Sequence, residues 1–362
     1  MNHRERFLAA VRMEPVDRIP FWPKIFNGYL KNQESTFKGC SLEEAYKFFD
    51  SEIQYGLPEF IVRSGKRSSQ KTRRENDLTI VEYILDNHSR RLVMKDDPTT
   101  LTSHPIEFPI NNESDLDFMA EWFSDGEFYA DISLLEKQRD LCVETGEDAA
   151  FAYFVGESPL MNFLEHLANI GNGHYLLHDF PEKTERLFAE MHRNLLMRCR
   201  VASSNPFADM FYFSENTSTT LISPDQFVRY CKPQIKEYAD ILNRSGVPVL
   251  LHMCGHLKGL LNILAENPVA GFEAFTPPTV GNTSLLDGRT ACPDMSLIGG
   301  TNAVMWLWET GDIIKYIYEM LDSLPHTNGI VLSPAGVMPP AAEPEKIKSV
   351  CEAISKYPVR NR

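Results

Sequence analysis

Short apolar runs alternate with longer helical patterns along most of this chain. The apolar runs span residues 15–23, 151–158, 208–216, 247–255, 271–278, 297–302 and 329–336. Ser223 followed by Pro224 is typical of a helix start, and Gly246 is typical of a helix end. Such regular alternation predicts a parallel sheet, either closed into a barrel or open and doubly wound.

The number of strand candidates favours closure into a barrel. Seven candidates, with an eighth expected near residues 50–65 or elsewhere, suit a (β/α)8 TIM barrel, an α/β fold that often reaches about 250 residues or more as one unit. No glycine-rich phosphate loop follows any of them, which weakens the nucleotide-binding alternative. We therefore expect one barrel domain over residues 1–362.

One segment departs from the strand-helix alternation. Residues 78–97 alternate with a period of two around the turn Asn87-His88-Ser89. This pattern predicts a β-hairpin. Because the segment falls between the first two strand candidates, we expect an insertion on the N-terminal side of the barrel that could form part of a lid.

The charge of the chain bears on its partners. A net charge of −14 and a pI near 5.2 repel phosphate backbones and anionic lipid surfaces. No apolar stretch approaches the roughly 18 to 20 residues of a membrane span, and residues 1–15 have an amphipathic helix pattern rather than that of a signal peptide. The seven cysteines show no paired spacing and are expected as free thiols. We expect a cytoplasmic protein without nucleic-acid or membrane partners.

Polar side chains stand at the ends of several predicted strands. In an α/β barrel these carboxyl ends form the mouth that holds the catalytic groups. The residues concerned are Glu157, Glu215, His252, Cys254, Glu273, Asn302 and Ser333. For Asn302 and Ser333, helix capping or loop packing explains the residue as well as function does. For Glu215 and Glu273, which flank the His-Cys strand, a functional role is the better explanation.

The spacing His252-x-Cys254 is the strongest chemical signal among them. Side chains two apart on a strand face the same side, so these two are expected together while Met253 turns away. An imidazole and a thiolate about 7 Å apart along a strand can both reach a zinc ion, although a catalytic zinc normally takes three protein ligands. His256 is better explained as a cap or surface group. Three further histidines lie in a helical region without metal spacing: His166, His174 and His178.

Four segments of the chain carry a resemblance to a known family. They are RERFLAAVRMEPVDRIPFWP, LISPDQFVRYCKPQIKEYADIL, HMCG and SPAGVMPPAAEPEKIKSVCEAI. Together they resemble the uroporphyrinogen decarboxylase superfamily and, more narrowly, its corrinoid-dependent methyltransferase branch, from residue 2 to about 356. True decarboxylases carry an arginine-rich segment after the first strand and lack His-x-Cys-Gly, whereas this chain has FWPKIFNGYLKNQ, with Lys24 and Lys31. The resemblance therefore implies an α/β barrel fold. Within the superfamily it favours the methyltransferase branch over the true decarboxylases.

The resemblance also implies a zinc ion. Its family ligands are the His and Cys of His-x-Cys-Gly, here His252 and Cys254, and a later Cys, with a Glu available in some members. The chain has Ala-Gly-Val at residues 335–337, where the later Cys is expected. Glu273, ahead of Glu215, is therefore expected as the replacement third ligand, since His, Cys and Glu remain competent for zinc.

The function implied is methyl transfer between a small methylated compound, such as a methoxy-aromatic, and a corrinoid protein, with zinc as a Lewis acid. We expect catalytic roles for Glu215, Glu273 and His252. Candidate substrate-binding residues are Trp22, Tyr153, Glu157, Tyr212 and Asn302. Because the third thiolate is missing, a metal-free decarboxylase or lyase of the same superfamily and a non-catalytic binding protein remain alternatives.

Overall fold

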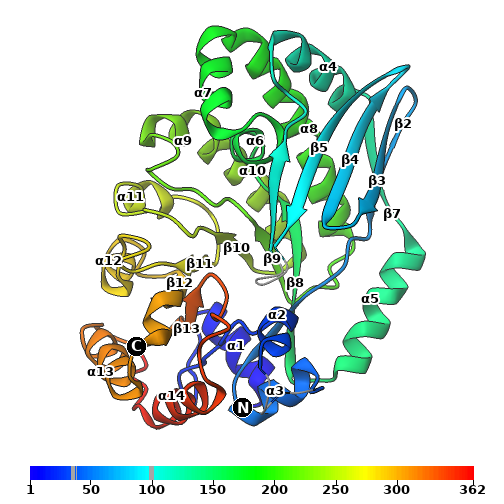
Figure 1. Cartoon of the computed structure of the whole chain (residues 1–362). Coiled ribbons are helices and arrows are strands. Elements are labelled where there is room, and N and C mark those ends of the chain that lie inside the picture. The colour runs from blue at the N-terminus through cyan, green and yellow to red at the C-terminus, as the bar shows by residue number, and fades with distance from the viewer. Residues whose placement is uncertain (34–36, 38, 98–101) are drawn as a thin grey trace.

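A parallel sheet forms the centre of the protein, seen in a computed structural model that describes residues 1–33, 37, 39–97 and 102–362. Over these residues the sheet has seven strands in the order β1-β8-β9-β10-β11-β12-β13 (Figure 1). The strands are β1 (Ile53–Gly56), β8 (Ala149–Gly156), β9 (Met210–Phe213), β10 (Val249–His252), β11 (Gly271–Phe275), β12 (Ser296–Asn302) and β13 (Ile330–Ala335). The six strands predicted from residue 151 onward are thus confirmed, and β1 is the strand expected within residues 50–65.

Phe21 closes this sheet into a TIM-barrel-like fold. The backbone N–H of Trp22 donates to the carbonyl of Leu332 in β13 over 2.9 Å, and the N–H of Glu52, next to β1, donates to the carbonyl of Phe21 over 3.1 Å. The segment 15–23 contributes a single bridge rather than the full strand that was expected. The reason is that Pro20 and Pro23 cannot donate to a strand ladder.

A buried ion pair holds the closing segment in place. Arg6, on the first helix, donates from Nη1 to Oε1 of Glu52 over 2.7 Å. The other carboxylate oxygen of Glu52 accepts the backbone N–H of Phe21 over 2.6 Å. Both charged side chains are almost fully buried, so neither has water as a substitute partner.

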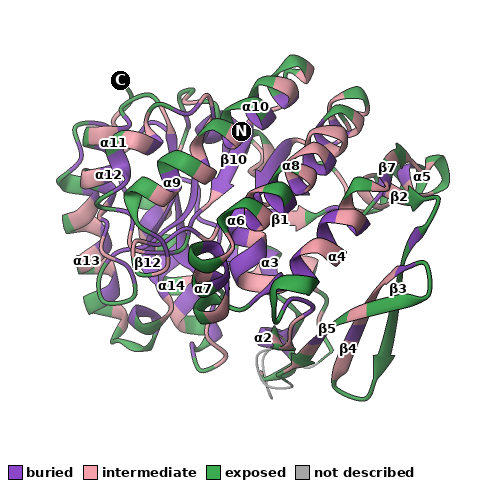
Figure 2. Cartoon of the chain, turned by 90° about the horizontal axis from the view of Figure 1, so that it is seen from above, coloured by how far each residue is buried: buried purple, intermediate pink, exposed green. Residues whose placement is uncertain are grey.

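Helices surround the barrel and turn their apolar faces to it (Figure 2). The helix predicted at Ser223 is confirmed, since the Ser223 hydroxyl accepts the N–H of Gln226, and Gly246 takes a left-handed φ of 77° where a helix ends. The helices are α1 (His3–Val11), α2 (Asn27–Lys31), α3 (Leu42–Phe49), α4 (Glu113–Ser124), α5 (Ile132–Thr145), α6 (Pro159–Asn162), the π-helix η1 (Phe163–Leu167), α7 (Ile170–Asp179), α8 (Pro181–Ser204), α9 (Pro224–Tyr230), α10 (Lys232–Leu242), η2 (Asn243–Ser245), α11 (Leu261–Leu264), α12 (Leu285–Ala291), η3 (Ala303–Leu307), α13 (Thr310–Asp322) and α14 (Pro344–Lys356).

The segment between β1 and β8 forms an additional antiparallel sheet beside the barrel (Figure 1). Its strands are β3 (Ser68–Glu75), β4 (Leu78–Leu85), β5 (His88–Asp96) and β6 (Ser103–Glu107), and a separate pair links it to the barrel, β2 (Ile61–Gly65) and β7 (Gly126–Ala130). The hairpin predicted over residues 78–97 is therefore confirmed. Its expected place on the N-terminal side of the barrel is wrong, because the insertion leaves from the carboxyl end of β1.

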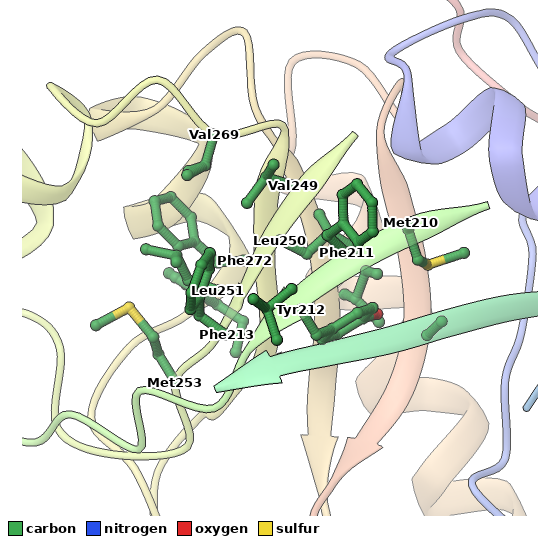
Figure 3. Packing of buried hydrophobic residues seen from close by; sticks show 14 of the residues in the cluster. Met210, Phe211, Tyr212, Phe213, Val249, Leu250, Leu251, Met253, Val269 and Phe272 are labelled. Atoms are coloured by element: carbon green, nitrogen blue, oxygen red, sulfur yellow. The ribbon is translucent and has the colours of Figure 1, made fainter. Parts of the chain in front are cut away.

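Strand alternation decides which side chains fill the core. On β9 and β10, Phe213 and Leu251 are register partners, and they are fully buried together with Phe272 of β11 (Figure 3). The alternate residues Tyr212 and Leu250 are also register partners and point to the opposite face of the strands. Among the described residues, no helix combines the length and apolar character needed to cross a membrane.

The buried contacts of Glu52 lead to a prediction about the stability of the protein. Glu52→Ala removes a partner of the Arg6 guanidinium and the acceptor of the Phe21 N–H, both of which are buried. We expect the free energy of unfolding to fall by about 3–5 kcal/mol, as measured by urea denaturation. The exposed Glu147, replaced by Ala as the matched control, should change it by less than about 0.5 kcal/mol. Equal effects of the two changes would show that the ion pair does not hold the barrel closed.

Candidate active site

Three charged side chains meet at the mouth of the barrel. His252 ends β10 and is the register partner of Glu273 on β11. Nδ1 of His252 bonds to Oε2 of Glu273, and Nζ of Lys24 forms an ion pair with Oε1 of the same carboxylate. Lys24 follows the closing segment in a left-handed backbone conformation, with φ of 48°. Glu273 and Lys24 are buried, and His252 retains 23% of its side-chain exposure, so the imidazole is the accessible member.

These contacts perturb the protonation of the three groups. Burial by itself lowers the pKa of His252, but the charge of Glu273 and hydrogen bonds with Cys254 and Glu273 outweigh burial and raise the pKa. Burial by itself raises the pKa of Glu273, but Lys24 and His252 outweigh it and hold the pKa well below its ordinary value. Glu273 is therefore a carboxylate whose two oxygens are both engaged by cations.

The thiol of Cys254 lies on the same side as the imidazole, as predicted from the strand spacing. Cys254 is exposed, whereas Met253 is fully buried in the hydrophobic core (Figure 3). The thiol donates to Oδ1 of Asn216 over 3.4 Å, and the backbone N–H of Asn216 donates to the carbonyl of His252 over 3.0 Å. Asn216 takes a left-handed φ of 44°, which Asn tolerates better than most residues. The loop after β9 thus positions the Cys254 thiol.

The expected metal ligands lie together, but with a division of contacts that the sequence did not show. Glu273 binds the imidazole through Nδ1 and so leaves the other ring nitrogen for a ligand. His252 and Glu273 are bonded, but within the described part of the chain His252, Cys254 and Glu273 do not bring three ligand atoms within 4.8 Å of one another. The role of Glu273 as third ligand stays a prediction.

A second group of ligand atoms lies at the end of β8. Glu157, Glu165 and His166 bring three ligand atoms within 4.8 Å of one another. Burial raises the pKa of Glu157 and, to a lesser extent, that of Glu165, and burial lowers the pKa of His166. Sequence spacing gave no metal signal for His166, because its partners are Glu157, nine residues earlier, and its immediate neighbour Glu165.

Glu215 is fully buried behind the mouth. Its carboxylate accepts the backbone N–H of Ser158 over 2.8 Å and the Ser158 hydroxyl over 2.7 Å. These bonds fix the turn between β8 and α6. Burial raises the pKa of Glu215 to about 7. The contacts give Glu215 a structural role, and its expected catalytic role stays a prediction.

The predicted substrate-binding residues are spread over different surroundings. Trp22 is buried, with the Lys24 ammonium 5.0 Å from its ring centre. Tyr212 points into the barrel and donates to Oε1 of Gln54 over 2.9 Å. The hydroxyl of Tyr153 instead bonds to Glu59 at the base of the insertion.

Asn302 caps a helix, one of the two explanations that the sequence left open. Its Oδ1 accepts the backbone N–H of Met305 in η3 over 3.1 Å. Its Nδ2 donates to the carbonyl of Pro278 over 3.0 Å. Since both ends of the amide are engaged by the backbone, a role in substrate binding stays a prediction.

The buried Glu215 carboxyl generates a pH prediction. Its pKa is raised in the folded state, so its neutral form contributes stability that is complete below the unfolded pKa of about 4.5 and is lost as pH rises through about 7. Between pH 5 and pH 8, wild-type protein should lose about 2.5 kcal/mol of unfolding free energy that the Glu215→Gln variant keeps. Denaturant unfolding across this range measures it, with Glu182→Gln, an exposed carboxyl, as control. Parallel pH profiles for wild type and Glu215→Gln would contradict the prediction.

Comparisons with known proteins show the family and the fold of this chain. The family model described as uroporphyrinogen decarboxylase (URO-D) matches residues 174–357. A solved methyltransferase from Methanosarcina mazei is 16% identical, covers 98% of both chains and has a TM-score of 0.65. A B12-independent methionine synthase from Shewanella sp. W3-18-1 is 9% identical, with 86% of this chain and 83% of that chain covered and a TM-score of 0.48.

No curated protein sequence is similar enough to this chain to be matched. The likeness to the Methanosarcina mazei structure shows a shared fold over almost the whole of both chains. The family model spans half of the chain, from α7 to the end of α14. The predicted resemblance is thereby confirmed, and this protein belongs to the uroporphyrinogen decarboxylase family.

Proposed function

We propose that this protein is a methyltransferase that moves a methyl group between a small methylated compound and a corrinoid protein. The observation that carries the proposal is the pairing, at a strand end in the barrel mouth, of an accessible imidazole with an exposed thiol, His252 and Cys254. Support comes from the family and from the fold shared with a methyltransferase along almost the whole chain.

His252 and Cys254 supply two ligands for a catalytic zinc ion, one fewer than the three protein ligands that such an ion normally takes. The imidazole of His252 is held through Nδ1 by a carboxylate, which is how metal-binding histidines are commonly oriented. Its other nitrogen and the Cys254 thiolate are the ligands we propose, with Glu273 orienting the imidazole. When bound, zinc supplies a Lewis acid that stabilises negative charge on an oxygen or sulfur atom of the substrate.

Neighbouring residues fix the positions of His252 and Cys254. Lys24 pairs with Glu273 and so keeps that carboxylate ionised and fixed against His252. Asn216 holds the Cys254 sulfur through its side-chain oxygen. Because the raised pKa of His252 favours the imidazolium, loading of the metal must release a proton, and binding should strengthen as pH rises.

The substrate we favour is an aromatic methyl ether. Phe154 is 43% exposed at the end of β8, and its ring lies 5.2 Å from that of Tyr212. Phe154 also borders a cavity of about 250 Å³ with Phe123, Phe128 and Glu157, although neither His252 nor Cys254 lines this cavity. In the reaction the methyl–oxygen bond breaks, the cobalt of the reduced corrinoid gains the methyl group, and the leaving oxygen takes up a proton.

A metal-free lyase is the second candidate function. The observation in its favour is the buried ammonium of Lys24, which is held at the mouth by its ion pair with Glu273. An ammonium can also attract a substrate carboxylate. The two functions differ in their need for zinc.

Replacement of Cys254 by Ser tests the methyltransferase proposal. Purified protein is analysed for zinc, and methyl transfer is followed as the methylcobalamin spectrum after mixing with a cob(I)alamin-loaded corrinoid protein and a panel of methoxy compounds. We expect wild type to contain zinc and to transfer methyl groups. Cys254→Ser should lower both the zinc content and the rate by about 10–100-fold or more, because the thiolate is a proposed ligand.

Cys142→Ser is the matched control, since this half-buried thiol lies on α5, outside the proposed site. It should leave zinc content and rate unchanged. Trace zinc in wild type, together with full activity of His252→Ala toward a carboxylate substrate, would favour the metal-free lyase. No methylcobalamin from any methoxy compound would count against the aromatic methyl ether.

A further inference from the structure

A group of two carboxylates and one imidazole lies apart from the His252–Cys254 pair. Nε2 of His166 is 3.4 Å from Oε1 of Glu157 and 4.0 Å from Oε2 of Glu165. Glu157 and Glu165 retain only 11% and 19% of their side-chain exposure. Three potential ligands therefore converge in a largely buried place.

The local backbone explains how neighbouring residues converge. Glu165 and His166 lie in η1, a π-helix, and Glu157 lies just before the short helix α6 that leads into it. Consecutive residues of an α-helix do not face each other. A π-turn is rare, and it occurs frequently at functional sites. Here it brings two adjacent side chains toward one carboxylate.

The hydrogen bonding and the charge of this group favour a bound cation. Oε2 of Glu157 and Oε1 of Glu165 are buried atoms without a hydrogen-bond partner. In the described ranges, no lysine or arginine forms an ion pair with either carboxylate. The two buried carboxylates repel each other, and the charge of His252 offsets burial only in part and only at Glu165, so keeping both ionised costs free energy. A cation between them would remove both penalties.

Two asparagine amides hold the remaining oxygens. Nδ2 of Asn162 donates to Oε1 of Glu157 over 2.6 Å, and Nδ2 of Asn216 donates to Oε2 of Glu165 over 3.0 Å. Hydrogen bonds from surrounding residues are a general feature of metal-binding carboxylates. They leave the other oxygen of each carboxylate without a hydrogen-bond partner. Asn216 also accepts from Cys254, so it links this group to the other pair.

We propose that Glu157, Glu165 and His166 bind one divalent cation, of the kind that accepts mixed oxygen and nitrogen ligands, such as Mn²⁺ or Zn²⁺. Two carboxylates and an imidazole suit such ions, and three protein ligands leave a coordination position open. This site shares no ligand with the zinc site of the proposed function and goes beyond it.

Mn²⁺ is the probe that separates the two sites, because it prefers carboxylate and imidazole ligands and binds thiolate poorly. Metal-free full-length protein is titrated with Mn²⁺, and free Mn²⁺ is measured by electron paramagnetic resonance. We expect one bound Mn²⁺ per chain. Glu165→Gln should weaken binding by about tenfold or more, since it removes one anionic ligand. Cys254→Ser should leave the affinity unchanged.

Asp179→Asn is the matched control, since Asp179 pairs with His178 on the surface and resembles the site only in residue type. It should not change the affinity. The proposal is overturned if wild type leaves Mn²⁺ free at millimolar concentration, or if Glu165→Gln binds it as tightly as wild type. A loss of binding in Cys254→Ser would also overturn it, because the ion would then sit at the other pair.

Thermal unfolding shows that the variant is folded. Without metal, Glu165→Gln should have a Tm no lower than wild type, because it removes one of two repelling charges. Added Mn²⁺ should raise the Tm of wild type but not that of the variant, since only a folded site binds it. Equal increases in both proteins would contradict the site. Neither measurement uses a corrinoid or a methyl donor, so failure here does not bear on the proposed function.

Discussion

The closure of the barrel at Phe21 is the contact on which the site depends. Glu52 accepts the N–H of Phe21 through its carboxylate, donates its own N–H to the Phe21 carbonyl and pairs with the buried Arg6. Lys24 follows three residues later, so closure also delivers the ammonium that binds Glu273. Without this closure, the barrel would lack the segment between β13 and β1. It would also lack the Lys24 ammonium that fixes the Glu273 carboxylate.

The mouth contains two groups of potential ligands, and Asn216 contacts both of them. His252 and Cys254 stand at the end of β10, and Glu165 belongs to the π-helix after β8. Asn216 contacts the backbone of His252, the thiol of Cys254 and the carboxylate of Glu165. Its left-handed backbone lets one short side chain reach both groups. The two groups share no ligand, and this one amide is their common contact.

The fold was largely predictable because its signals are local. Buried parallel strands need continuous apolar runs, and each run in the chain became a strand or, at Phe21, a bridge limited by two prolines. Only part of the inserted sheet was predictable from the sequence. Its β4–β5 hairpin alternates, whereas β3 reads Ser-Ser-Gln-Lys-Thr-Arg-Arg-Glu and is exposed almost throughout, so pairing with β4 alone makes it a strand.

The sequence by itself determined the barrel, the strand ends at its mouth and the common side of His252 and Cys254, because strand period and apolar runs act over a few residues. Only the tertiary structure decided that Glu273 engages Lys24 and His252, and that Glu165 and His166 meet Glu157. Lys24 and Glu273 are about 250 residues apart in sequence, and they meet only when the first and last strands close the barrel. The π-turn likewise depends on packing that no short pattern records.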